Sequence, residues 1–480
     1  MKRFWLVLLS VGLVLTISAE AFAVDVKVSA TFYEAGMYQD KTTFIKNGYY
    51  LDSTGALVPD NGGPSTAFFY QRLRVETDFI LSPSLKLVTR FNAMERIWGG
   101  ARSEPGTTLD LQSAATRAEN ENIGFDWAYV EYVSPIGMFD LGYMDDGGWG
   151  TVFGDSTVPR PIASWAAQQG PWTAFFQLVK INDNSKSAVH VTNVTDNDTD
   201  KYQAGFIYES KGSQTGLLAI YYRDASNRPI YVGTVDEGVN ANVFVLQPYA
   251  IVNIGPVKLQ AELDYAWGGI KADAPPGEFG QDLKVDNLAG WIDAMVDLKM
   301  FYFGGSIAYV AGNDFHKFAS DGTIKGGFLT GGMDWNPTLI LFNSERNYWA
   351  GTIQGNAGST TNSNYLGNLF GLNDTGMYNA WFLQGRVGVR PVDKLDIQAS
   401  ISHAMADSTS WVGNLSGQPD FVSSNYGTEI DLIATYKINN NLSYMAGFGY
   451  LFTGDYFKGI DPNVDVRDNY MFLNKLTLTF

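Results

Sequence analysis

The segment 469–480 alternates between apolar and polar side chains. One face carries the apolar set Tyr470, Phe472, Leu476, Leu478 and Phe480. The other face carries the polar set Lys475, Thr477 and Thr479. A period of two residues is typical of a β-strand with one apolar and one wet face. This alternation recurs along most of the chain, so it restricts the fold to sheets.

The first residues of the chain have the pattern of a secretory signal. Lys2 and Arg3 precede the apolar run 4–17, and Ala21-Phe22-Ala23 forms a small-x-small cleavage site. We predict a signal peptide over 1–23 and a mature chain from Val24. The alternative, an uncleaved membrane anchor, is disfavoured because the run is shorter than the ~20 residues that a spanning helix needs.

The composition limits how the mature chain could enter a membrane. Polar residues interrupt every later apolar run, so a closed barrel is the remaining way to pair all backbone groups in lipid. There are no cysteines, which excludes disulfides and thiolate sites. The formal net charge of −17 argues against nucleic acid as a partner.

Strand candidates recur with short and long connections in turn, which is typical of bacterial outer-membrane barrels. The short turns are expected in the periplasm and the longer loops outside. The candidates are 24–33, 69–81, 85–96, 127–132, 139–143, 162–168, 172–181, 201–209, 216–223, 243–252, 257–267, 288–298, 301–310, 380–390, 395–403, 429–438, 442–452 and 469–480.

We therefore predict an all-β fold: a transmembrane antiparallel up-and-down β-barrel of about 18 strands, with 16 or 20 left open. Residues 24–480 form its single domain. A soluble solenoid or sandwich would also alternate, but the sequence has no fixed-period repeat. The outward phases also carry aromatic residues near strand ends, as interfacial girdles do. Strand 469–480 resembles the insertion signal that barrel-assembly machinery reads, with Phe480, Leu478 and Leu476 as its elements.

The inward phases carry many ionisable residues, which a water-filled lumen tolerates and uses for selectivity. The predicted basic wall consists of Arg72, Arg74, Lys86, Arg90, Arg96, Arg386 and Arg390. The alternative is that these are solvated or mutually paired wall charges without a tuning role. For Arg72, Arg74 and Arg90 we favour a functional role, because like charges on adjacent strands repel unless an acidic partner or anionic solute faces them.

The segment 145–160 is a candidate constriction loop. It is acidic and rich in glycine, and its key residues are Asp145, Asp146, Trp149, Phe153 and Asp155. In position and composition it resembles the third loop of general porins, which folds inward to face a basic wall. The alternative is a loop that lies outside, over the barrel rim.

The segment 311–378 is too long for an ordinary connection, so we expect a long external loop or a plug. Three blocks carry a family resemblance: 331–342 (GGMDWNPTLILF), 426–437 (YGTEIDLIATYK) and 447–457 (GFGYLFTGDYF). They are similar to the alginate-export-like porins, best over the last ~150 residues. The resemblance implies an 18-stranded barrel.

These features predict an outer-membrane porin: a water-filled channel for passive diffusion of small hydrophilic solutes or ions. Two alternatives are an export conduit for a polyanionic polysaccharide and a sleeve for a periplasmic or redox partner. We expect no catalytic residues, metal or cofactor. The expected partners are outer-membrane lipid, lipopolysaccharide, the assembly machinery and the solutes, and a homo-oligomer is compatible with the sequence.

Overall fold

The computed structural model describes residues 24–51, 57–60, 63–100, 123–183, 198–225, 239–272, 282–353, 355–356 and 376–480. The predicted signal peptide, 1–23, lies outside these residues. No helix in the described part is both long and apolar enough to cross a membrane.

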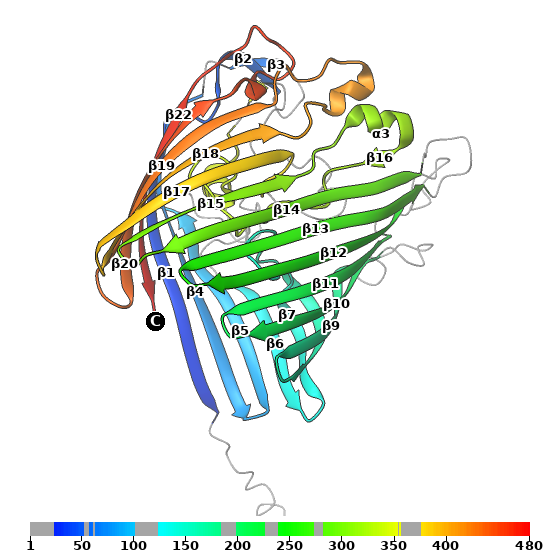
Figure 1. Cartoon of the computed structure of the whole chain (residues 1–480), viewed down its shortest axis with the longest axis vertical. Helices are drawn as coiled ribbons and strands as arrows, with labels where there is room; N and C mark the ends of the chain where they lie inside the picture. The colour runs from blue at the N-terminus through cyan, green and yellow to red at the C-terminus, as the bar shows by residue number, and fades with distance from the viewer. Residues whose placement is uncertain are drawn as a thin grey trace, which may run out of the picture.

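The described residues form one closed antiparallel barrel of 18 strands (Figure 1), which confirms the predicted fold class. Each strand pairs with its neighbour along the chain, and β1 also pairs with β22 to close the sheet. The strands are β1 (Asp25–Gln39), β4 (Thr66–Ser82), β5 (Leu85–Ile97), β6 (Gly124–Ser134), β7 (Gly137–Asp145), β8 (Pro159–Gln169), β9 (Trp172–Asp183), β10 (Asp198–Ser210), β11 (Ser213–Asp224), β12 (Val239–Ile254), β13 (Val257–Ala272), β14 (Leu283–Asp297), β15 (Phe301–Val310), β17 (Ala380–Val392), β18 (Leu395–Ala406), β19 (Asn425–Lys437), β20 (Leu442–Thr453) and β22 (Asn469–Thr479).

Short turns join the strands at one end of the barrel. Gly170 has φ 60° between β8 and β9, and Gly255 has φ 60° between β12 and β13. Both lie in the left-handed region, where glycine carries no Cβ penalty. The long connections that the structure describes in full, such as 146–158 and 407–424, join the strands at the other end, as the sequence pattern predicted.

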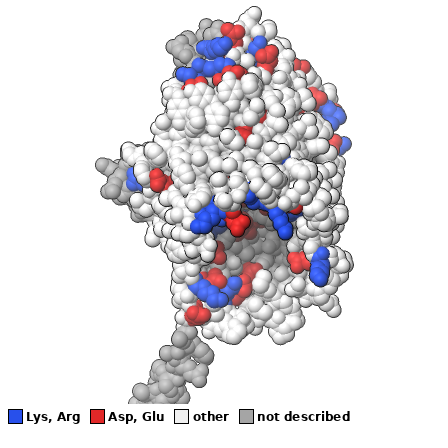
Figure 2. Space-filling view, turned by 60° about the vertical axis from the view of Figure 1, so that its left-hand side comes forward, with Lys and Arg blue, Asp and Glu red and all other residues white. Residues whose placement is uncertain are grey.

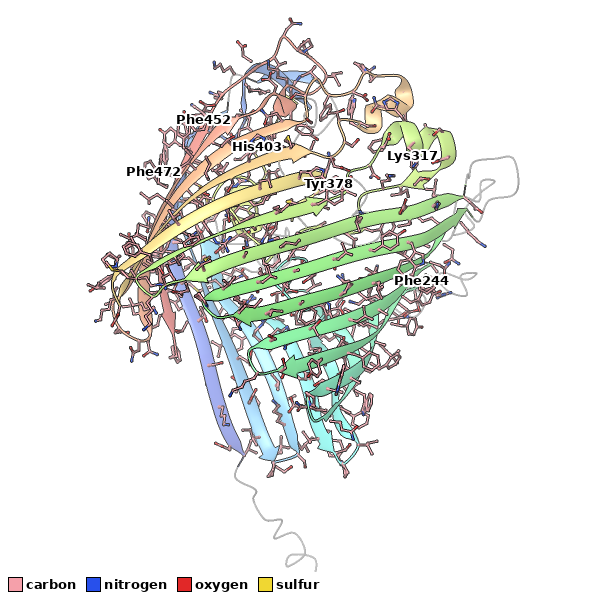
Figure 3. The ribbon with its side chains drawn as sticks, in the orientation of Figure 1. Phe244, Lys317, Tyr378, His403, Phe452 and Phe472 are labelled. Carbon is pink, nitrogen blue, oxygen red and sulfur yellow. The ribbon has the colours of Figure 1, made fainter. Side chains whose placement is uncertain are left out.

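The outer face of the barrel is an apolar band. Phe244, Phe452 and Phe472, labelled in Figure 3, lie on it and are 44%, 49% and 51% exposed. Near the end with the long loops, aromatic rings follow one another across neighbouring strands in the order Tyr202, Tyr221, Phe244, Trp267 and Tyr265. Such a belt is typical of barrels at a membrane interface.

Short elements lie within the long connections. They are β2 (Ile45–Leu51), β3 (Leu57–Asp60), β21 (Asp465–Val466), α3 (Phe315–Asp321), β16 (Thr323–Ile324), α4 (Ser344–Ala350) and the 3₁₀ turns η3 (Val412–Ser416) and η4 (Asp455–Lys458). Of these, α4 lies inside the barrel, where Trp349 stacks on Tyr70 of β4 with 4.6 Å between ring centroids. The Asp314 side chain caps α3 by accepting hydrogen bonds from the N–H groups of His316 and Lys317.

The hydrophobic core lies inside the barrel, because two long connections fold inward. Phe153 from 146–158, and Ile340, Leu341 and Phe342 from 311–379, are fully buried. They pack with inward-facing apolar residues of the wall, including Trp291 of β14. Simple alternation would place polar side chains on the inner face of each strand. The inner face is apolar instead where these two segments pack against it.

Candidate solute channel

The inner wall of β4 and β5 carries arginines with acidic partners on the same wall. Arg72 Nη1 lies 3.2 Å from a carboxylate oxygen of Glu95. Asp126 of β6 lies 3.2 Å from Arg90 and 3.7 Å from Arg74. The repulsion among the three guanidinium groups is therefore compensated within the wall, which supports the paired alternative for these residues.

The other predicted basic residues are also paired. Lys86 Nζ lies 2.9 Å from Glu131, and Arg386 Nη2 lies 2.6 Å from Asp293. Arg390 lies 2.9 Å from both Asp297 and Asp396. The wall is therefore a mixed-charge surface in which basic side chains pair with acidic side chains of nearby strands.

Arg96 is a correction to the predicted wall. Met94 has φ 52°, and the pairing of β5 with β4 shifts register between Leu73 and Gln71. This bulge exchanges the two faces, so Glu95 is buried and Arg96 shares the phase of the exposed Met94. Arg96 instead donates to the carbonyl of Gly100 at the strand end.

The loop between β7 and β8 is tied to the opposite wall. The Trp149 indole N–H donates to the Gln247 carbonyl of β12 (2.9 Å), and the Thr151 N–H donates to Glu262 of β13 (3.0 Å). The buried Phe153 ring stacks on Trp291, with 6.1 Å between centroids. These contacts hold both aromatic residues inside the barrel.

The loop carboxylates do not pair with the arginine cluster as the sequence analysis supposed. Asp146 forms its ion pair with Lys201 of β10, a residue that was not singled out from the sequence. Asp145 accepts hydrogen bonds from the N–H groups of Gly147 and Val158. Within the cluster, Arg90 acts electrostatically on Asp145. The inward phase of Lys201 on its strand is the sequence signal that could have identified it as a partner for the acidic loop.

Asp155 holds the loop together from within. Its carboxylate accepts the N–H of Trp149 at 2.7 Å. Burial is the largest influence and raises its pKa to about 7, although the Trp149 N–H lowers it. Asp334, Asp145 and Asp264 add to the rise through charge repulsion.

The long connection between β15 and β17 meets this loop inside the barrel. The Asp334 N–H donates to the Asp155 carbonyl (3.0 Å), and the Met333 N–H donates to Ser156 Oγ (3.0 Å). Farther along, the buried Glu429 of β19 accepts the N–H groups of Ile340 (2.7 Å) and Leu341 (2.8 Å). The sequence predicted a long external loop or a plug over 311–378. Among the described residues of this segment, those around Ile340 and Leu341 lie in the lumen.

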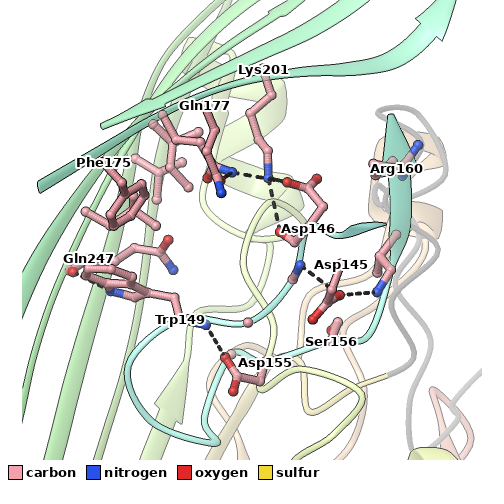
Figure 4. Close-up of a pocket in the computed structure, with 18 of the residues that line it drawn as sticks. Asp145, Asp146, Trp149, Asp155, Ser156, Arg160, Phe175, Gln177, Lys201 and Gln247 are labelled. Atoms are coloured by element: carbon pink, nitrogen blue, oxygen red, sulfur yellow. Dashed lines mark hydrogen bonds and ion pairs between the residues drawn. The ribbon is translucent and has the colours of Figure 1, made fainter. Parts of the chain in front are cut away.

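A cavity of about 680 Å³ remains between the two inner segments and the wall of β7–β13. Figure 4 shows Trp149 and Phe175 on one side of it and Asp145 and Asp146 on the other. Figure 2 shows a hollow in the molecular surface with basic and acidic side chains around it, whereas most of the surrounding surface carries neither. Within the described ranges, no group of three His, Asp or Glu side chains could hold a metal ion.

Solved structures align with nearly the whole chain at low sequence identity. A BenF-like porin from Pseudomonas fluorescens Pf-5 is 12% identical, over 96% of this chain and all of that one (100%), with a TM-score of 0.49. OccAB2 of Acinetobacter baumannii is 10% identical, over 95% and 98%, with a TM-score of 0.48. OccK9 (OpdG) of Pseudomonas aeruginosa is 12% identical, over 95% and 99%, with a TM-score of 0.48.

Comparisons by sequence find no relative. No family model matches the chain, and no curated protein matches it. The resemblance to the alginate-export-like porins therefore finds no support. What this chain does has to be argued from its own geometry.

Proposed function

We propose that the chain forms a water-filled channel in the outer membrane for passive diffusion of small hydrophilic solutes. The observation that carries this proposal is the contrast between the two faces of the barrel. Outside lies an apolar band, whereas the inner face carries partly exposed charged side chains, such as Arg72 (26%), Arg74 (29%) and Lys86 (28%). Such groups favour water in the lumen, since even paired charges are costly to remove from water.

The same contrast supports the cellular location and the partners expected from the sequence. A barrel with an apolar band and an aromatic belt suits an outer membrane of lipid and lipopolysaccharide. Delivery by a cleaved 1–23 signal and insertion by the barrel-assembly machinery complete this proposal, and an assembly of several copies would be compatible with it.

We further propose that the loop 146–158 narrows the channel together with the inner part of the 311–379 connection. A barrel of this strand number leaves an aqueous passage unless something partly fills it. The contacts of Phe153, Thr151 and Glu429 support this role, since each holds an inner segment against the wall.

Two other functions fit the geometry less well. A polyanion conduit needs a continuous basic track, but Arg72, Arg90 and Arg386 each have an acidic partner. A sleeve for a folded partner needs an empty lumen, but Phe153 and Phe342 occupy it.

Conductance in planar bilayers tests the proposed function. We expect discrete current steps from the purified full-length chain, with a preference for cations because carboxylates outnumber basic residues in the chain. Ion selectivity is measured as the reversal potential across a salt gradient. A heat-modifiable, folded barrel that gives no current above the detergent control would overturn the proposal.

A further inference from the structure

The cavity beside the inner loop has the size of a ligand pocket. Its volume of about 680 Å³ lies within the ~300–1,000 Å³ usual for small-molecule sites. It is bounded by the strands β7–β13 and by residues of both inner segments, including Trp149 and Phe328. A cavity of this volume can accommodate a small molecule as well as water and ions.

One side of the cavity is apolar. Trp149 and Phe175 form an aromatic corner, with 5.6 Å between ring centroids and 57° between their planes. Leu218, Ile220 and Val245 extend this surface along β11 and β12. Inward-facing apolar side chains that border a cavity favour a solute that carries apolar surface of its own.

The other side of the cavity has more hydrogen-bond acceptors than free donors. Of the described lining residues, two are basic, and both are engaged: Lys201 pairs with Asp146, and Arg160 donates to the Ile181 carbonyl. The carboxylate residues in the lining are Asp140, Asp145, Asp146, Asp155, Glu262 and Asp264. A carboxyl group has two oxygens and at most one proton, so in either protonation state it can accept more hydrogen bonds than it donates, and acceptor positions remain on this side.

We propose that this cavity binds a small amphipathic solute with a hydrogen-bond-donating polar end, such as an alcohol or a primary amine. The apolar body of the solute lies against Trp149 and Phe175, and its hydroxyl or ammonium group faces the carboxylates. An anionic solute is disfavoured, because it brings further acceptors and like charge. The inference deepens the proposed channel function and rests on it, since the lumen is the route by which a solute reaches the cavity.

Four matched compounds test this assignment. 2-Phenylethanol and 2-phenylethylamine carry the ring and a donor, 3-phenylpropionate carries the ring and an anion, and ethanolamine carries donors without a ring. Titration calorimetry on the folded full-length chain measures their affinities, and block of the bilayer current measures occupancy of the channel. We expect the first two to bind about tenfold or more tightly than the others, a difference of ~1.4 kcal/mol.

The two ring compounds with donors differ in their polar group, which is a neutral hydroxyl with one donor in the first and a cationic ammonium with three donors in the second. If the charge of the lining contributes to binding, 2-phenylethylamine should bind more tightly than 2-phenylethanol at low salt. This gain in affinity should disappear near 1 M salt, where the Debye length is ~3 Å. Asp264→Asn should reduce the gain, because the variant replaces an ionisable carboxyl group of the lining with a neutral amide whose oxygen can still accept from Gln247.

Neighbouring phenylalanines provide a matched pair of variants. Phe175 faces the cavity, whereas Phe176 points out of the barrel and is 44% exposed. Phe175→Ala should weaken both ring compounds about tenfold and leave ethanolamine unchanged, whereas Phe176→Ala should change none of them. Heat-modifiable mobility of each variant confirms that the barrel is folded.

The outcomes separate this inference from the function on which it rests. Tight binding of 3-phenylpropionate, equal binding of all four compounds, binding of none, or identical effects of the two phenylalanine variants would each overturn the ligand class. Selective binding without any current would overturn the channel and leave the binding site in place. Current without selective binding would overturn the binding site and leave the channel in place.

Discussion

Asp155 connects the two inner segments and also responds to pH. Its side-chain carboxylate accepts a hydrogen bond from the Trp149 N–H, and its backbone carbonyl accepts one from the Asp334 N–H. The ordinary pKa of an aspartate is ~3.9, and burial raises that of Asp155 to about 7. Between these values the docked loop keeps a proton that the undocked loop has lost. The docked loop therefore becomes less stable as the pH rises from about 4 to 7.

We expect the loop 146–158 to open more often above pH 7 than at pH 5. The measurement is hydrogen exchange of the loop amides, or current fluctuation, across that range. Asp155→Asn is the control, because its side-chain oxygen still accepts from Trp149 without titrating, so its exchange should not depend on this transition. A wild-type loop equally protected at pH 5 and pH 8 would contradict the argument.

The arginine cluster supports a second prediction at this scale. Replacing Arg72, Arg74 and Arg90 with serine leaves Glu95 and Asp126 without their cationic partners. Cation preference should rise, and more strongly at 0.1 M than at 1 M salt, where the Debye length falls from ~10 Å to ~3 Å.

The reversal potential across a salt gradient measures this change. Adding Glu95→Gln and Asp126→Asn to the triple variant removes the uncompensated acids and should return the selectivity towards that of the unaltered chain. If the triple variant has an unaltered reversal potential at low salt, the cluster does not face the conducting path.

Single residues were only partly predictable from the sequence. The inward phase of Arg72 and Arg90 follows from alternation, but alternation does not give their partners Glu95 and Asp126. Glu95 falls in the wrong phase until the bulge at Met94 is known. A bulge depends on how two strands pair, and a period of two within one strand does not reveal it.

At the scale of elements, every strand of the barrel was predictable, because each has its own alternation and its own turn, whereas the short strands β2, β3, β16 and β21 were not predicted. The packing of the inner segments was not predictable in the same way. Their supports, such as Ala289 and Trp291 of β14, are apolar residues in the inward phase. Where one half of a strand is apolar on both its outward and its inward face, the inward residues indicate that a protein segment packs against the inside of the wall.

Phe153 provides the test of loop docking. Phe153→Ala removes a fully buried ring between Trp291 and Trp335, and such a change costs about 3–5 kcal/mol. We expect higher single-channel conductance and a larger solute limit. Val152→Ala, next to it and 42% exposed, should leave both unchanged. Equal conductance in the two variants would mean that the loop does not narrow the channel.

At the scale of the whole molecule, the strand number and the single closed sheet were predictable, because short and long connections alternate along the entire chain. Closure depends on the seam between β1 and β22. There Phe480 and Ala30 exchange backbone hydrogen bonds of 3.0 and 2.8 Å, and the Phe480 ring lies on the outer face, 63% exposed.

We expect Phe480→Asp to reduce the amount of folded barrel in the outer membrane sharply, because a charge on the lipid-facing side of the seam opposes insertion. Heat-modifiable mobility and surface labelling measure the folded fraction. Phe480→Trp retains an interfacial aromatic ring and should assemble normally. A Phe480→Asp barrel present at normal abundance would contradict this prediction.

The contact between Phe153 and Trp291 also sets an order of events during synthesis. The loop after β7 reaches the translocation machinery well before β14, on which it rests. Until β14 emerges, Phe153 has no Trp291 to rest on, whereas Trp149 can already contact Phe175 of β9 and Tyr249 of β12. An apolar segment such as that around Phe153 is prone to aggregate while it is exposed. The stretch around Phe153 is therefore where we expect a periplasmic holding chaperone to bind, and a chain truncated before β14 should remain bound there.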